Sequence, residues 1–179
     1  MPRGGKGDGG GADGCAKGEA SQGEVMKDVD LNPLFTRSDS DELLHSLWEC
    51  IERKSNRLQR SVNDSQRFFF LAWEAVEVLN GDGFRTLLGL DFALNDYAES
   101  LVKIGMPELG PIFDRVDGLI PTGLRSPEKT SERLAFLLAF DEELDNLLRE
   151  FLEASKDVIP IMCSYVREHR GDFADFIDG

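Results

Sequence analysis

Apolar residues recur along most of the chain at helical spacing, and this pattern predicts an all-α fold. The first regular run begins after Ser40, whose hydroxyl can cap a helix, and Asp41 and Glu42 follow near the positive end of the helix dipole. Its apolar positions share one helix face at i, i+3 and i+4 spacing: Leu43, Leu44, Leu47, Trp48 and Ile51. We therefore expect a helix from about residue 41 to about residue 62.

The segment after Asp64 is apolar on almost every side between residues 68 and 79, where Glu74 and Glu77 are the only charged residues. A helix that is hydrophobic all round is a buried helix. We expect this segment to form the central helix of the fold. Its core side chains should include Phe69, Trp73 and Val76.

The strongest turn signal follows this helix, at residues 80–83. Asn and Gly tolerate the positive φ that a helix C-terminus needs, so we expect φ > 0 at Gly81 or Gly83. The turn is expected to be structural, with its residues supporting the fold rather than chemistry: Asn80, Gly81, Gly83 and Phe84.

The remaining residues predict further helices with short connections. These helices are expected over residues 84–90, 91–104, 107 to 116 or 119, 127–140 and 141–170. Pro160 lies inside the last one and should break or kink it near 155–160, because proline lacks the N–H donor and clashes with the preceding turn. Since no segment shows the two-residue alternation of a β-strand, we expect a compact bundle of about six to eight helices.

Glycine separates a tail from this helical region. Nine of the 18 glycines lie in the first 23 residues, and almost no apolar side chain is there to be buried in return for ordering them. We expect residues 1–30 to form a disordered Gly-rich tail, which contains Cys15, and residues 31–179 to form a single all-helical domain.

Acidic residues dominate the charge of the helical region. The chain has 34 acidic residues against 20 Lys plus Arg, a net charge of −14, and twelve of these net charges lie in residues 64–179. Such a field disfavours direct binding to nucleic acid or to an anionic membrane and favours a basic partner. No apolar run approaches the roughly 18 residues of a membrane span, and the N-terminus has no apolar signal-peptide core. Three widely spaced cysteines indicate reduced thiols, so we expect a cytoplasmic protein.

Several motifs resemble catalytic or ligand-binding sites, but none has the neighbouring residues that such a site needs. The glycines at 5, 7 and 10 match a dinucleotide-binding motif, but no strand precedes them and no helix follows them. Glu42 and His45 have the spacing of a di-iron site, but the chain lacks the second Glu–His pair and the two further carboxylates that such a site needs. Cys50 does not share a helix face with His45, and Cys163 is expected to fill the core. We therefore expect no catalytic residues, no metal and no cofactor. The basic residues 53–60 are expected to pair with the protein's own acids.

A stripe of carboxylates is the most informative polar feature. Glu143, Glu150 and Asp157 are seven residues apart, and Glu153 lies beside them, so on one helix their heads would be roughly 5–10 Å apart. Carboxylates held at this scale can imitate DNA phosphates towards a basic protein, although a solvated helix face explains the same pattern. A second acidic set has i, i+3 spacing: Asp114 and Asp117.

Four motifs of residues 70–179 resemble those of the small, acidic, all-helical DNA-mimic proteins and their uncharacterised relatives, a domain family of unknown general function. They are the helix end and turn Glu77-Val78-Leu79-Asn80-Gly81-Asp82-Gly83-Phe84, the helix end Leu101-Val102-Lys103-Ile104-Gly105, the segment from Ile112 to Pro121, and Tyr165 followed by Gly171-Asp172-Phe173. Asp82 is inserted between the family's two glycines, and Thr86-Leu87-Leu88-Gly89 replaces its aromatic and asparagine positions.

The resemblance implies an all-helical fold and a role in binding a partner. In the member that gave the family its name, the acidic surface of a dimer occupies the DNA-binding face of a transcriptional repressor, so a homodimer is one option for this chain. We expect a non-enzymatic acidic interaction protein whose partner is a basic protein surface, such as that of a DNA-binding regulator. Two alternatives remain: a scaffold or immunity-like module that recognises its partner through an apolar groove, and an enzyme with an unrecognised carboxylate pair.

Overall fold

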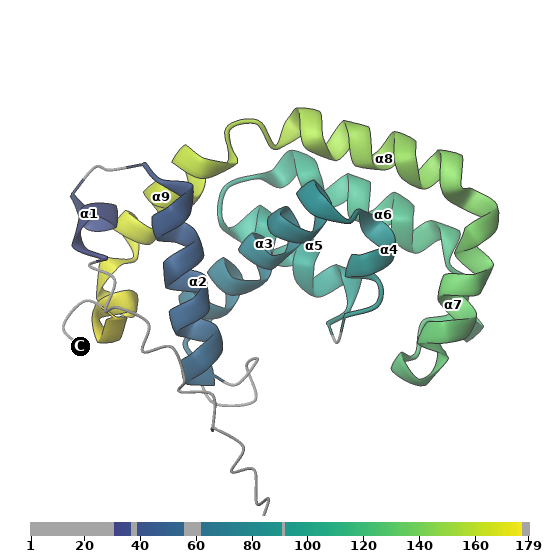
Figure 1. The fold of residues 1–179 in the computed structure, drawn as a ribbon, viewed down its shortest axis with the longest axis horizontal. Helices are drawn as coiled ribbons and strands as arrows, with labels where there is room; N and C mark the ends of the chain where they lie inside the picture. Colours follow the sequence, from purple (N-terminus) through teal and green to yellow (C-terminus); the bar gives the residue numbers. More distant parts are fainter. Residues whose placement is uncertain (1–30, 37–38, 56–61, 91, 177–179) are drawn as a thin grey trace, which may run out of the picture.

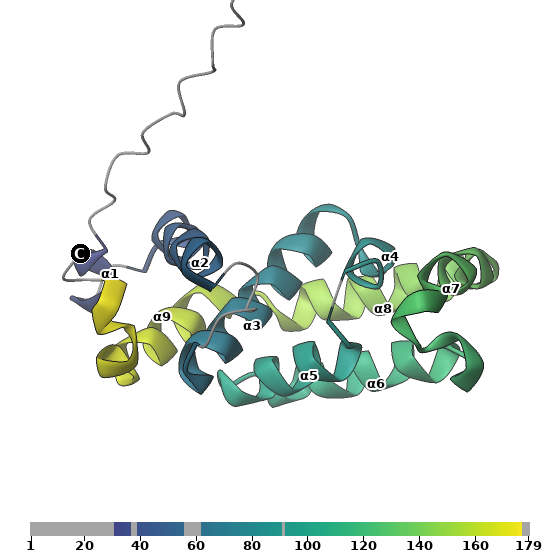
Figure 2. The same ribbon diagram turned by 90° about the horizontal axis from the view of Figure 1, so that it is seen from below.

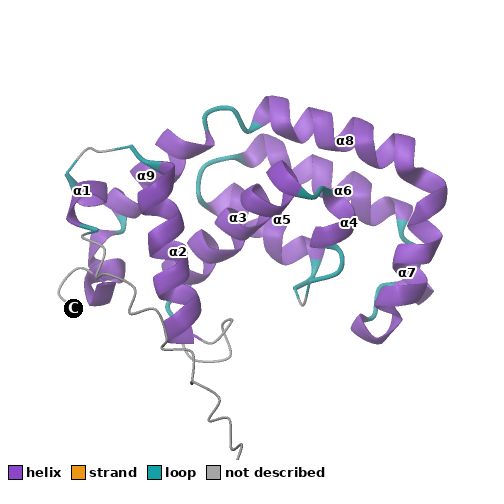
Figure 3. Cartoon of the chain, in the orientation of Figure 1, coloured by secondary structure: helices purple, strands orange, loops and turns teal. Residues whose placement is uncertain are grey.

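The computed structural model describes residues 31–36, 39–55, 62–90 and 92–176, and every regular element in these ranges is helical (Figure 3). The expected tail at 1–30 lies outside the described residues. The α-helices are α1 (Asn32–Phe35), α2 (Asp41–Ser55), α3 (Asp64–Gly81), α4 (Phe84–Leu87), α5 (Leu94–Lys103), α6 (Gly110–Leu119), α7 (Thr130–Leu137), α8 (Asp141–Ala154) and α9 (Val158–Glu168). Five 3₁₀ segments complete the chain: η1 (Pro107–Leu109), η2 (Thr122–Leu124), η3 (Pro127–Lys129), η4 (Leu138–Phe140) and η5 (Arg170–Phe176). Seven of the described α-helices have eight residues or more, which confirms the predicted all-α bundle.

Helix α3 lies at the centre of the fold, as predicted. It packs against α2, α4, α5 and α8, which lie beside it in Figures 1 and 2. Phe69, Trp73 and Val76 are each at most 1% exposed. Aromatic contacts join α3 to its neighbours: the Trp48 ring of α2 stacks on Phe70 at 5.4 Å between centroids, and Phe173 of η5 meets Phe69 edge-on at 5.8 Å.

The buried length of α3 includes a carboxylate. Glu74 is only 4% exposed, and it accepts a 2.8 Å hydrogen bond from the hydroxyl of Tyr97 on α5. Glu77, one turn later, is exposed. A buried charged group requires such partners, because desolvation without hydrogen bonds is costly. The Glu74–Tyr97 contact therefore fixes α5 against α3 in addition to the apolar contacts between them.

The turn after α3 has the predicted conformation. Gly83 has φ +78°, and the N–H groups of Asp82 and Gly83 both donate to the Val78 carbonyl, at 2.7 and 3.0 Å. These bonds satisfy a carbonyl that the end of the helix would leave without a partner. Phe84 follows directly and is buried against Phe113 and Phe151.

Several helix boundaries differ from the expected ones. Helix α5 begins at Leu94 rather than at residue 91, because Ala93 is extended and its N–H donates to the Asp96 carboxylate at 3.3 Å. The short helix expected over 84–90 ends at Leu87, and α9 ends at Glu168. Helix α1, which carries Pro33 in its first turn, was not anticipated. The first long helix was expected to reach about residue 62, but α2 is described only to Ser55, residues 56–61 lie outside the described residues, and Val62 is not helical.

The predicted break near Pro160 is confirmed. Helix α8 ends at Ala154 and α9 begins at Val158, so Pro160 lies in the first turn of α9. A proline costs no intrahelical hydrogen bond at that position, because the first N–H groups of a helix have no partner within it. Ser155 is buried at the break, and its carbonyl accepts from the Val158 N–H at 3.0 Å.

The η5 segment binds the start of α3 across more than a hundred residues of sequence. The Asp172 carbonyl accepts hydrogen bonds from Asn63 Nδ2 at 2.8 Å and from Gln66 Nε2 at 2.5 Å. The Asp172 carboxylate accepts from Ser65 Oγ at 2.6 Å. Asn63 also caps α3, since its Oδ1 accepts from the Gln66 N–H at 2.8 Å. The N-terminus of the central helix is thus held by a segment near residue 172.

Trp73→Ala should lower the free energy of unfolding by about 3–5 kcal/mol, because it removes a large buried side chain from α3 and the surrounding helices relax only partly. Denaturant unfolding followed by circular dichroism measures this. Leu138→Ala is the control: the Leu138 side chain is 60% exposed, so its loss should change stability by no more than about 0.5 kcal/mol. A loss below about 1 kcal/mol for Trp73→Ala would show that α3 is peripheral.

Gly83→Ala should destabilise the protein by about 1–2 kcal/mol, because a Cβ is strained at φ +78°. Gly81→Ala is the matched control. It lies at the end of α3, and no atom is within 4 Å of the Cβ that would be added. Thermal and denaturant midpoints of the two variants test the difference, and equal destabilisation would contradict a strained backbone at Gly83.

Candidate acidic interaction surface

Helix α8 lies on the outside of the molecule, where it packs on α6 and α3 (Figure 1). Its buried face consists of Leu144, Leu147 and Phe151. The rest of the helix carries six acidic residues and one basic residue, a net charge of −5 within 14 residues. An amphipathic helix at the periphery presents its polar face to solvent, so α8 accounts for much of the acidity of the folded region.

Glu143 and Glu150 of the predicted stripe lie on this helix and line one shallow groove of about 760 Å³ beside α6. Arg115 of α6 also lines the groove, and its guanidinium binds both Glu150 carboxylate oxygens, at 2.5 and 3.2 Å. This hydrogen bond raises the pKa of Arg115; burial opposes the rise, and the charges of Glu150 and Glu143 add to it. The charge of Glu150 is therefore partly compensated within the protein.

Glu153 and Asp157 do not continue the stripe as a row of carboxylates. Glu153 is exposed on α8 but pairs with Lys156 at 2.5 Å. The prediction was wrong for Asp157: α8 ends at Ala154, and Asp157 is the residue that precedes α9. The break associated with Pro160 removes Asp157 from the helical spacing on which the stripe was based.

The second predicted set, on α6, is also divided. Asp114 is exposed and makes no ion pair within 4.0 Å among the described residues. Asp117 is partly buried and binds Arg125 at 3.0 Å between Oδ2 and Nη2. The pair at i, i+3 spacing therefore presents one uncompensated carboxylate rather than two.

The strongest accumulation of uncompensated acid lies at the start of α8, from which the predicted stripe included only Glu143. Asp141 binds Arg85, but Glu142, Glu143 and Asp145 are exposed and make no ion pair within the part of the chain that the structure describes. We call these three residues the acidic end of α8. The signal was the cluster of four acids within residues 141–145, of which the seven-residue spacing selected only Glu143. Acids in a first helical turn are also stabilised by the helix dipole.

The expectation that the basic residues pair with the protein's own acids holds for Lys54 but not for Arg53, which makes no ion pair among the described residues. Lys54 binds Asp175 at 2.5 Å, and Arg67 binds Asp96 at 2.7 Å. Arg57 and Arg60 of the predicted basic segment lie outside the described residues. The charges of Lys54 and Arg67 are therefore partly neutralised by acids of the same chain.

Cys163 of α9 lies in the core, as the sequence predicts. Cys163 is fully buried, and this burial raises the pKa of its thiol. A higher pKa leaves less of the reactive thiolate at neutral pH. Within the described ranges, no group of three or more His, Cys, Asp or Glu side chains is placed to hold a metal ion. The described helices also include none with the length and apolar character needed to cross a membrane.

Comparison of the chain with protein-family models, with curated proteins and with solved structures finds no match. The resemblance to the DNA-mimic family therefore stays a prediction from the motifs of residues 70–179.

Cys163 should resist alkylation in the folded protein, because its thiol is buried and has a raised pKa, whereas the half-buried Cys50 should react. Iodoacetamide treatment at mildly alkaline pH, followed by peptide mass spectrometry, measures both rates. Concentrated guanidinium chloride is the control, in which the two cysteines should react alike. Equal rates in the native protein would show that Cys163 is accessible and would reopen a role as a nucleophile.

Proposed function

We propose that this chain is a non-enzymatic interaction protein that binds a basic protein surface through the acidic end of α8. The observation that carries the proposal is the set of three exposed carboxylates, Glu142, Glu143 and Asp145, which have no ion-pair partner among the described residues. They lie on a rigid helix whose opposite face is buried. Fixed, uncompensated charges of one sign attract the opposite charges of a partner over longer distances than any contact.

The groove beside α6 supplies a place for contact once the partner has approached. Glu142, Glu143 and Glu150 line it together with two guanidinium groups, those of Arg115 and Arg149. A lysine or arginine of the partner can bind the free carboxylates or displace Arg115 from Glu150. The mixed charge of the groove favours recognition of a defined pattern of basic side chains over non-specific attraction.

We further propose a DNA-binding regulator as the class of partner, with DNA as the competitor for its basic surface. Two features support this: the motifs of residues 70–179 that resemble the DNA-mimic family, and the position of the uncompensated acids in the folded region. Glu143 and Glu150 are two helical turns apart, which corresponds to about 10 Å along the helix. Carboxylates at such fixed spacing can replace phosphates on a protein that binds the DNA backbone.

A second candidate function is favoured by apolar groups close to the same helix. Phe136 in the last turn of α7 and Leu138 in η4 are 37% and 60% exposed. The Phe136 ring lies 5.3 Å from that of Phe140, which lines the groove. A module that recognises its partner mainly through such apolar contacts would bind with little dependence on salt. Salt dependence therefore separates the two candidates.

Replacing the acidic end of α8 with its neutral isosteres, as Glu142→Gln, Glu143→Gln and Asp145→Asn together, should slow association with the partner by about tenfold at low salt. The difference should shrink as salt is raised, because exposed charges are screened. The partner is first isolated by affinity capture from native cell extract at two salt concentrations. Association rates are then measured by surface plasmon resonance, with and without the partner's DNA as competitor.

The matched control removes three other exposed acids at the opposite end of the molecule: Glu42→Gln, Asp64→Asn and Glu168→Gln. It changes net charge by the same amount and should affect association much less. If both triple variants slow association equally, total charge matters and the acidic end of α8 is not the binding surface. If neither salt nor the α8 variant has an effect, the apolar contacts at Phe136 and Leu138 become the better candidate.

A further inference from the structure

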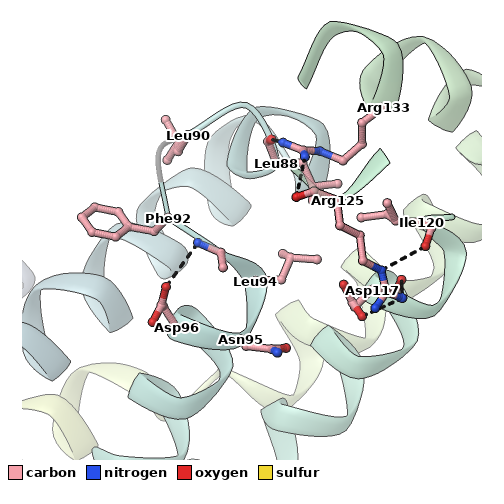
Figure 4. Close-up of a pocket in the computed structure, with 11 residues that line it drawn as sticks. Leu88, Leu90, Phe92, Leu94, Asn95, Asp96, Asp117, Ile120, Arg125 and Arg133 are labelled. Carbon is pink, nitrogen blue, oxygen red and sulfur yellow. Dashed lines mark hydrogen bonds and ion pairs between the residues drawn. The ribbon is translucent and has the colours of Figure 1, made fainter. Parts of the chain in front are cut away.

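A separate cavity of about 450 Å³ lies where the segment between α4 and α5 meets the end of α6 and the start of α7 (Figure 4). Its volume is within the range of about 300–1,000 Å³ that is typical of small-molecule sites. Much of the wall is apolar, formed by Leu88, Leu90, Phe92, Leu94 and Ile120. None of the three residues of the acidic end of α8 takes part in it, so the cavity is independent of the proposed partner surface.

Arg133 of α7 supplies a buried cation to this cavity. The residue is only 7% exposed. Its Nη2 donates to the Leu88 carbonyl at 2.8 Å and to Thr130 Oγ1 at 3.1 Å, while Nη1 donates to backbone carbonyls of the preceding loop, the shortest bond being 3.2 Å to Leu124. Nε is buried and has no hydrogen-bond partner among the described residues. One donor of a nearly buried guanidinium is thus unused.

The charge of Arg133 is not balanced by an acid. Its hydrogen-bond partners are neutral carbonyls and a hydroxyl, and no carboxylate of the described chain lies within 4.0 Å of it. The other ionic groups on the wall already have partners: Arg125 binds Asp117 at 3.0 Å, and Asp96 binds Arg67 at 2.7 Å. A buried charge without a counter-charge is unfavourable. An anion bound in the cavity would therefore supply the negative charge that Arg133 lacks.

We propose that this cavity binds a small apolar molecule that carries a single carboxylate. The carboxylate lies against the Arg133 side chain, whose charge no acid of the described chain balances, and the apolar part packs against Leu94, Ile120 and their neighbours. One uncompensated positive charge matches a monoanion better than a phosphate or another multiply charged group. The apolar wall excludes a strongly hydrated ligand, because its polar groups would lose water without gaining partners.

Octanoate is the probe that tests this proposal, with 1-octanol and acetate as comparisons. Octanol keeps the apolar chain without the charge, and acetate keeps the charge without the chain. Each is titrated into the full chain, and methyl NMR signals of Leu88, Leu94 and Ile120 are followed. We expect saturable shifts with octanoate and affinity at least about tenfold weaker for both comparisons, the ratio that a charged hydrogen bond supports. Equal binding of octanol and octanoate would overturn recognition by Arg133, and shifts confined to other methyl groups, or none, would overturn the site.

Substitutions at the rim of the cavity test octanoate binding without removing a side chain that the fold needs. Arg133 itself holds several loop carbonyls, so its replacement could unfold the region. Ala93 is exposed and lines the cavity, and Ala93→Trp should fill the entrance and abolish octanoate binding. Ala135→Trp is the matched control, at an exposed alanine of α7 outside the cavity, and should bind octanoate as the parent does. Unchanged binding in a folded Ala93→Trp variant would contradict the proposal.

Discussion

The burial of α3 on nearly all of its sides is the constraint on which the rest of the structure depends. An apolar helix of 18 residues is stable in water only if other elements cover it, and each neighbour does so with a specific contact: Trp48 from α2, Tyr97 from α5 and Phe173 from η5. The covering helices need only one apolar face each. Their outer faces are consequently free to carry charge, which is why the acids collect on a peripheral helix such as α8.

Local patterns in the sequence were sufficient for most of the fold. The apolar run from 68 to 79 identified the central helix, the glycines at 81 and 83 identified the turn, and Pro160 identified the break, because each effect depends on neighbouring residues. The start of α5 was missed because it depends on a backbone contact of Asp96, and α1 was missed because a four-residue helix has too few positions to show a period. The burial of Glu74 depends on Tyr97, 23 residues away.

The candidate surface was less predictable, because charge compensation is a tertiary property. Glu143 and Glu150 were correctly assigned to one side of a helix, since that follows from spacing alone. The pairing of Glu150 with Arg115 joins residues 35 positions apart and has no local signal. The same holds for Arg133, whose surroundings come from three separate segments that the fold brings together. Sequence patterns thus indicate which residues are charged, while the fold determines which charges stay uncompensated.

The bonds between Asp172 and the first turn of α3 have a consequence for the order of folding. The side-chain donors of Asn63, Ser65 and Gln66 bind Asp172 of η5, more than a hundred residues later. On the ribosome, α3 emerges long before this segment, so its apolar surface around Phe69 stays uncovered while most of the domain is being synthesised. Closing such a distant contact is a slow step in folding, and the waiting helix is exposed to aggregation. The start of α3 therefore gains its bonds to Asp172 only after the residues near 172 leave the exit tunnel.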